Sequence, residues 1–122
     1  MAAPANRIAG TCFVKVGGRQ LSIAGTITVS PAKVEREGKA GLSGVAGYVE
    51  KSRVPYIEVE CNALPAVRLA DLEAVVNETV TAELGNGRTY ILRNAWLAPA
   101  IEEAAAEGTF TARFEGMDCQ EI

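Results

Sequence analysis

Residues 79–97 constrain the fold most, because they carry the pattern of a β-hairpin. The first arm, residues 79–84, alternates polar and apolar side chains, and the second arm, residues 88–97, is rich in β-branched and aromatic ones. Gly85, Asn86 and Gly87 separate the two arms. An Asn-Gly pair between alternating runs is a strong short-range hairpin signal. The sequence therefore predicts two antiparallel strands joined by a tight turn.

Two loop lengths are compatible with this turn, and they differ in which residues lie opposite each other. A three-residue loop over residues 85–87 places Val80 opposite Leu92, whereas a two-residue loop places Val80 opposite Arg93. Because side chains alternate between faces, only the first register gathers the apolar side chains on one face. We therefore predict the three-residue loop, with a glycine at its left-handed position.

The predicted register gives the hairpin one apolar face and one polar face. The apolar face holds Val80, Ala82, Leu84, Tyr90, Leu92 and Trp96. The polar face holds Thr79, Thr81, Glu83, Thr89 and Arg93. Ile91 falls on the polar face and departs from this pattern. Since the apolar face has to be buried, the polar face is where function could lie.

The other patterns predict a mainly β fold, an antiparallel β-sandwich or barrel with one short α-helix. Alternating or β-rich segments predict further strands over residues 11–16, 19–23, 26–30, 54–61 and 109–115. Residues 69–76 carry apolar side chains at helical spacing, with acidic residues early in the segment, and predict the helix. Residues 98–108 are expected to form a crossing loop. The length of 122 residues predicts a single domain over the whole chain.

Residues 38–50 are glycine-rich and are expected to form a loop. Ala40 follows Gly38-Lys39 where a P-loop requires Ser or Thr, so a phosphate cradle is not predicted. A flexible connector is the simplest interpretation. A second interpretation is an intersubunit loop, because such a loop cannot bury the apolar side chains of Leu42, Val45 and Tyr48 by itself. Residues 1–10 are expected to form a mobile or partner-bound N-terminal arm.

Composition excludes further classes of function. The net charge of −3 and the pI near 5.0 argue against a protein that grips nucleic acid by its phosphates. The chain has no histidine, which excludes imidazole-based zinc sites and histidine-dependent nucleophiles. Cys12, Cys61 and Cys119 lie far apart and are interpreted as reduced, strand-borne small hydrophobes. No membrane anchor or signal peptide is predicted, and no catalytic, cofactor-binding or metal-ligating residue is assigned.

Glu58 and Glu60 are the strongest candidates for catalysis. On one face of a strand their carboxylates would lie about 7 Å apart, a separation compatible with glycosidase chemistry. A lone Glu-x-Glu pair is, however, far more often part of a solvated face. A small enzyme using Glu58, Glu60 or Asp71 is therefore one alternative function, and a monomeric ligand-binding β-barrel is another.

Taken in order, these segments resemble the tail tube proteins of contractile-tailed bacteriophages, in the Mu-like branch of the family. The resemblance spans nearly the whole chain, and its order and total length are more specific than any single motif. The motifs that carry it are Arg7-Ile8-Ala9-Gly10, Gly17-Gly18, Gly25-Thr26-Ile27-Thr28-Val29, Gly44-Val45-Ala46-Gly47-Tyr48, Val54-Pro55, the predicted helix, Thr79-Val80-Thr81, Gly87-Arg88-Thr89-Tyr90, Ala95-Trp96 and Phe114-Glu115-Gly116.

The resemblance implies a structural subunit of the inner tail tube, which is not an enzyme and needs no cofactor. Such subunits form hexameric rings that stack into a tube, and the genome passes through the lumen without specific binding. The implied partners are the tail sheath, baseplate and tape-measure proteins, and the implied location is the virion, after synthesis in the host bacterial cytoplasm. A tube protein of a related contractile injection or secretion system is an alternative within the same fold.

The resemblance also assigns roles to the two candidate surfaces. We predict that Thr79, Thr81, Glu83, Thr89 and Arg93 face the lumen, where small polar groups without excess positive charge would not retain phosphates. We predict that Leu42, Val45 and Tyr48 contact the next ring, because stacking requires a heterologous contact that does not close.

Overall fold

The structure is a computed structural model that describes residues 12–65 and 67–122. The described residues form eleven strands and one helix, which confirms the predicted mainly β fold with a single short helix. The predicted N-terminal arm lies outside the described residues. The elements are β1 (Phe13–Val16), β2 (Arg19–Leu21), β3 (Ile23–Ser30), β4 (Val34–Gly41), β5 (Gly44–Ser52), β6 (Tyr56–Asn62), α1 (Leu69–Glu73), β7 (Glu78–Glu83), β8 (Thr89–Leu97), β9 (Glu103–Ala104), β10 (Thr109–Glu115) and β11 (Asp118–Glu121).

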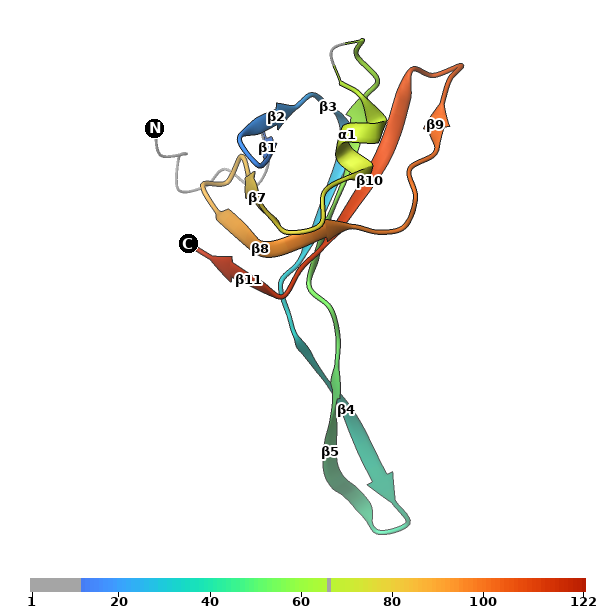
Figure 1. Cartoon of the computed structure of the whole chain (residues 1–122). Helices are drawn as coiled ribbons and strands as arrows, with labels where there is room; N and C mark the ends of the chain where they lie inside the picture. Colours follow the sequence, from blue (N-terminus) through green and yellow to red (C-terminus); the bar gives the residue numbers. More distant parts are fainter. Residues whose placement is uncertain (1–11, 66) are drawn as a thin grey trace.

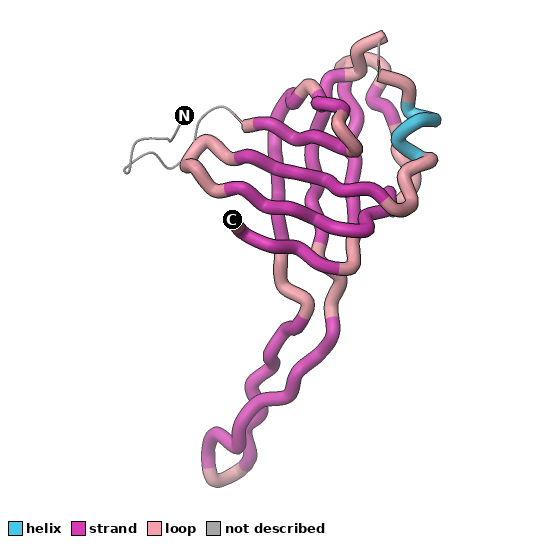
Figure 2. Tube along the Cα trace, turned by 60° about the vertical axis from the view of Figure 1, so that its left-hand side comes forward, coloured by secondary structure: helices cyan, strands magenta, loops and turns pink. Residues whose placement is uncertain are grey.

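Most strands form an antiparallel sandwich of two layers. The first layer has the order β2-β1-β7-β8-β11, and the second contains the end of β8 followed by β10, β6 and β3, with β9 beside β10. The strands of one layer run across those of the other (Figure 2). The fold is thus a sandwich in which one strand, β8, belongs to both layers.

The central hairpin, β7 and β8, has the predicted register. Val80 pairs with Leu92 across the ladder. In the turn, the Leu84 amide donates a hydrogen bond to the Arg88 carbonyl oxygen over 2.8 Å. Gly87 has a φ of 92°, which is favourable for glycine and costly for other residues. The three-residue loop with a left-handed glycine is therefore confirmed.

Strand β8 bends at Asn94 as it passes between the layers. Asn94 has a φ of 51°, a conformation that asparagine tolerates better than most residues. Its side-chain amide donates a 2.7 Å hydrogen bond to Asn77 Oδ1. The bend shifts the alternation of side chains, so that Ala95 is fully buried and Trp96 is only half-buried. The prediction that Trp96 shares the buried face with Leu92 is therefore wrong.

One apolar core fills the space between the layers. Its largest fully buried side chains are Phe114, Ile57, Leu92, Val14, Val59, Val80 and Cys61. Each such side chain contributes about 1.5–3 kcal/mol on burial, so the core is the main source of stability. Burial, aided by the neighbouring Glu60 carboxylate, raises the pKa of the Cys61 thiol to about 12. Cys61 is thus a protonated small hydrophobe.

Helix α1 is shorter than the predicted segment, residues 69–76. Leu72 and Val75 are buried as expected, but Val76 is 73% exposed and lies beyond the helix. The Val75 carbonyl oxygen accepts a 3.1 Å hydrogen bond from the Leu97 amide. This contact with β8 replaces a helical hydrogen bond and directs the chain into β7, so packing on the sandwich ends the helix early.

Strands β4 and β5 form a separate hairpin that projects far from the sandwich (Figures 1 and 2). Residues 38–50, expected as a loop, are extended strand except at the turn of Leu42 and Ser43. The two arms pair from Val34 with Ser52 to Gly41 with Gly44, which satisfies the backbone that a free loop would leave to solvent. Every residue of β5 is exposed.

Candidate assembly surfaces

The outward face of the first layer, which we call the outer face, is a broad and mainly polar surface that also includes Ile91 and the exposed Phe13 opposite Glu83. Thr81 and Ile91 lie side by side on β7 and β8. Lys15 on β1 pairs with Thr81, and Gln120 on β11 pairs with Ile91. One continuous row of side chains therefore crosses four strands. Lys15 and Gln120 were missed from the sequence because their strands lie far from the central hairpin along the chain, although Lys15 does alternate with buried valines.

The five predicted lumen residues all lie outside the core. Thr81 and Thr89 are half-buried, and the other three, Thr79, Glu83 and Arg93, are exposed. Arg93 donates a 3.2 Å hydrogen bond to the Gln120 side chain. Because the intervening Val80 and Ala82 are fully buried, the sandwich fixes which side chains point outward. The structure thus brings these residues together with Ile91, which is half-buried among them.

Charges of both signs occur on the outer face. Lys15 lies on β1 and Arg93 on β8, while Glu83 lies on β7 and Asp118 pairs across the ladder with Arg93. The surface therefore combines small hydroxyl groups with balanced charge, and these residues do not create the basic track that holds a nucleic-acid backbone.

The two faces of the projecting hairpin carry different sets of side chains. On one face Tyr48 pairs with Gly38 and Val45 pairs with Ala40. The Arg36 guanidinium lies 5.6 Å from the centroid of the Tyr48 ring on this face.

The opposite face of the hairpin carries an ionic cluster beside Val49, which pairs with Glu37 and is exposed. The Glu37 carboxylate forms salt bridges with both Lys39 and Lys51. Exposed ion pairs of this kind contribute little stability and keep a surface hydrated. Apolar side chains therefore occur at the tip and on both faces of the hairpin, and the face of Tyr48 also carries the 3.7 Å salt bridge between Arg36 and Glu50.

The three predicted contact residues, Leu42, Val45 and Tyr48, all belong to this hairpin. Their exposures are 113%, 87% and 61%, so the chain itself covers little of their side chains. An isolated two-stranded hairpin is only marginally stable in water, and clustered exposed apolar side chains mark interaction sites. The hairpin therefore has the properties of an element that is completed by a partner.

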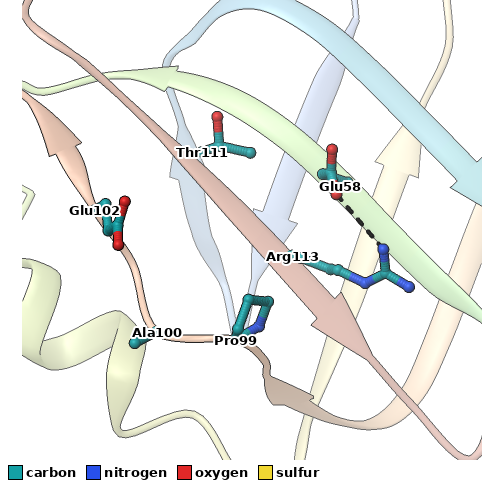
Figure 3. Close-up of a pocket in the computed structure, with 6 residues that line it drawn as sticks. All are labelled: Glu58, Pro99, Ala100, Glu102, Thr111 and Arg113. Carbon is teal, nitrogen blue, oxygen red and sulfur yellow. Dashed lines mark ion pairs between the residues drawn. The ribbon is translucent and has the colours of Figure 1, made fainter.

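A shallow pocket of about 510 Å³ lies on the outward side of the second layer (Figure 3). It is lined by Glu58, Pro99, Ala100, Glu102, Thr111 and Arg113. Arg113 forms salt bridges with Glu58 at 3.7 Å and with Glu115 at 3.2 Å. Its guanidinium also stacks on Tyr56, 3.8 Å from the ring centroid. Arg113 thus ties β10 to β6. Residues 98–108, expected to form a crossing loop, contain the two-residue strand β9 and close one side of the pocket.

Of the candidate catalytic carboxylates, Glu58 and Glu60 both point outward from β6, as the sequence predicts, whereas Asp71 lies on a different element. Glu58 is paired with Arg113 on the neighbouring strand. Asp71 lies on α1 and forms a 3.3 Å salt bridge with Arg19. Within residues 12–65 and 67–122, no group of three or more His, Cys, Asp or Glu side chains is placed to hold a metal ion. The same part of the chain contains no helix with the length and apolar character needed to cross a membrane.

The sequence matches the family model described as phage tail tube protein over residues 5–121. The chain belongs to the phage tail tube protein family. It is similar to the Mu-like prophage FluMu tail tube protein of Haemophilus influenzae, with 24% identity over 118 residues that cover 97% of this chain and 98% of that protein. It is also similar to the tail tube protein of Escherichia phage Mu, with 29% identity over 93 residues that cover 76% and 78% of the two chains.

The fold agrees with this family. The structure superposes with a TM-score of 0.65 on the PVC sheath/tube terminator of an extracellular contractile injection system, at 12% identity over 100% of this chain and 97% of that one. The tail tube protein described here is thus a structural subunit of a phage tail and a component of the virion, and its family is not an enzyme family. The resemblance predicted from the sequence is confirmed.

Proposed function

We propose that this tail tube protein assembles as hexameric rings, that the rings stack into the tail tube, and that the outer face of the first layer lines the lumen. The observation that carries the proposal is the outer face itself, a mainly polar surface of balanced charge over an apolar core. The first layer ends at β2 on one side and at β11 on the other. Closing such layers into one multi-subunit barrel removes edges that would otherwise invite aggregation.

The chemistry of the proposed lumen suits the passage of DNA without retention. Binding to nucleic acid grows with the number of phosphates that Lys and Arg neutralise. Here Lys15 and Arg93 are offset by Glu83 and Asp118 on the same sheet. DNA would therefore pass threonine hydroxyls and mixed charges and would meet no site that holds it.

The projecting hairpin is proposed to make the contact between rings. Its apolar residues, Leu42, Val45 and Tyr48, are exposed in the single chain. A contact between different surfaces of identical subunits repeats without closing, as stacking requires. In this arrangement the second layer faces away from the lumen. The tail sheath would surround that layer, and the baseplate and tape-measure proteins would be further partners of the tube.

Electron microscopy tests the assembly directly. We expect purified protein at high concentration to form rings or hollow tubes of uniform width in negative stain, with matching growth in light scattering. A chain that stays monomeric at every concentration, with and without a baseplate complex to initiate growth, would refute the proposal.

Thiol labelling tests the lumen assignment. In a chain with Cys12 and Cys119 replaced by alanine, Thr81→Cys in assembled tubes should react with a small thiol reagent but resist a bulky one. Thr111→Cys provides the matched control, because Thr111 is exposed on the outward side of the second layer. The control should react with both reagents. Equal access of the bulky reagent to both positions would show that the outer face does not line a lumen.

A further inference from the structure

The projecting hairpin and α1 lie at opposite ends of the molecule (Figure 1). Strands β3 and β6 connect these ends, because their ladder runs from Ser30 paired with Tyr56 to Ile23 paired with Cys61. The first of these pairs adjoins the base of the hairpin, and the second adjoins β2 and the loop that leads to α1. A seven-residue strand such as β6 spans about 23 Å. The two ends are therefore separated by the full length of the second layer.

A groove of about 420 Å³ opens between β2 and α1, at the end away from the hairpin. Its lining residues are Arg19, Gln20, Leu21, Val67, Asp71 and Leu72. Leu21 and Leu72 are 4% and 2% exposed and belong to the core, so the groove has a firm apolar floor. Val67 is half-buried and packs against the same core. Arg19 and Asp71, which line the groove, form a salt bridge between β2 and α1, with exposed side chains.

We propose that this groove receives the hairpin tip of a copy in the adjacent ring, with Leu42 as the inserted side chain. The inference rests on the proposed stacking of rings and names the surface that the hairpin contacts. Leu42 is fully exposed at the tip. Gly41 and Gly44 flank the turn, and a Cβ at either position would meet no atom within 4 Å, so the tip is narrow and unobstructed. The tip presents one apolar side chain, and the groove presents an apolar floor between the polar side chains of Arg19, Gln20 and Asp71.

The charges at the two surfaces are of mixed sign and do not oppose the pairing. Close to the tip, the hairpin carries the ion pair of Glu37 with Lys39. The ion pair of Arg19 with Asp71 lines the groove. Each pair offers both signs, so the partners can exchange without leaving a like-charge contact, which would disfavour docking.

The position of the two surfaces identifies the occupant as a second copy of this chain. A tip at one end and a groove at the other form a heterologous contact, and the acceptor copy still has a free tip for the next one. Pairing of two hairpins with each other would instead be isologous. It would leave the groove empty and end at two copies.

Cross-linking tests the contact in assembled tubes. In the background with Cys12 and Cys119 replaced by alanine, the double variant Leu42→Cys with Val67→Cys should form a disulfide between copies under mild oxidation. Because each link joins a chain to one in the next ring, a non-reducing gel should show a ladder that continues past the hexamer. The ladder should collapse on reduction. The matched control is Leu42→Cys with Glu107→Cys, since Glu107 is exposed in the loop before β10 at the same end of the second layer but outside the groove.

The outcomes separate the groove from the stacking proposal. One result is that tubes form without a cross-link between positions 42 and 67, and another is that they form with an equal cross-link in the control. Either result would refute the contact between the tip and the groove and would leave the stacking proposal intact. A ladder that stops at the hexamer would place the contact within a ring and would also overturn the inference. If the parent chain forms neither rings nor tubes, the stacking proposal fails and the groove fails with it.

Discussion

Replacing Leu42 by alanine should separate folding from assembly. Leu42 is 113% exposed in the single chain and lies in a turn between two exposed strands. Its truncation removes no buried contact, so the free energy of unfolding of the monomer should change by less than about 0.5 kcal/mol. The melting temperature of the unassembled protein should stay the same.

Assembly should respond strongly to the same change. If Leu42 is buried between rings, its truncation removes about three carbons from an apolar contact, or about 2 kcal/mol at roughly 0.8 kcal/mol per methylene. That difference weakens each contact about thirtyfold, since 1.4 kcal/mol is a factor of ten. All copies in a ring lose the contact together, and linked contacts multiply. The concentration needed for tube growth should therefore rise far more than thirtyfold.

The assay compares unfolding and tube growth in the same preparations. Chemical denaturation gives the free energy of unfolding, and sedimentation with electron microscopy gives the amount of tube. Met117→Ala is the control, because Met117 is also a large exposed apolar side chain, at 65%, but lies outside the hairpin and the groove. Tubes that form equally well with Leu42→Ala would refute the role of the tip. A parallel loss of folding stability would show that the hairpin supports the monomer instead.

Three predictions concern the sandwich itself. Phe114→Ala should lower the free energy of unfolding by about 3–5 kcal/mol in a denaturant titration, because Phe114 is fully buried; a loss below about 1 kcal/mol would contradict this packing. Gly116→Ala should lower the thermal midpoint, since a Cβ there would lie 2.8 Å from Leu92 Cγ and 2.9 Å from the Arg93 carbonyl oxygen; an unchanged midpoint would refute the close approach. The Cys61 pKa, raised from 9.0 to about 12, means that the unfolded chain loses this proton first, so stability present below pH 9 should decline between pH 9 and 12. Cys61→Ala should decline less steeply over that range, and identical slopes would contradict burial of the thiol.

The sequence contained enough information for the hairpin register and the type of fold, because those depend on local alternation. Val80 and Leu92 had to face the core together, and only one loop length allowed it. The features that the sequence did not predict depend on contacts between residues that are far apart in the chain or on an unusual backbone conformation. The bond from Leu97 to the Val75 carbonyl ends α1 early, and the left-handed turn at Asn94 moves Trp96 away from the predicted face.

The hairpin tip and the groove between β2 and α1 were predictable from the sequence to different extents. The exposure of the apolar residues could be predicted because a glycine-rich segment contains too few side chains to bury them. The glycines also interrupt the alternation of polar and apolar side chains, so β4 and β5 were expected as a loop. The groove could not be anticipated. Its floor combines Leu21 with Leu72, which are far apart in the sequence and are brought together by the packing of α1 beside β2.

The projecting hairpin gives each subunit a direction. Since it leaves the sandwich at one end only, identically oriented subunits build a filament with two chemically different termini (Figure 1). In the proposed stack, one terminus would display the apolar hairpin tips and the other would not. Subunits would then add to the two termini at different rates, and no single capping protein would fit both termini. A competitor that presents only the hairpin would block the addition of subunits at one terminus, and subunits would still add at the opposite terminus.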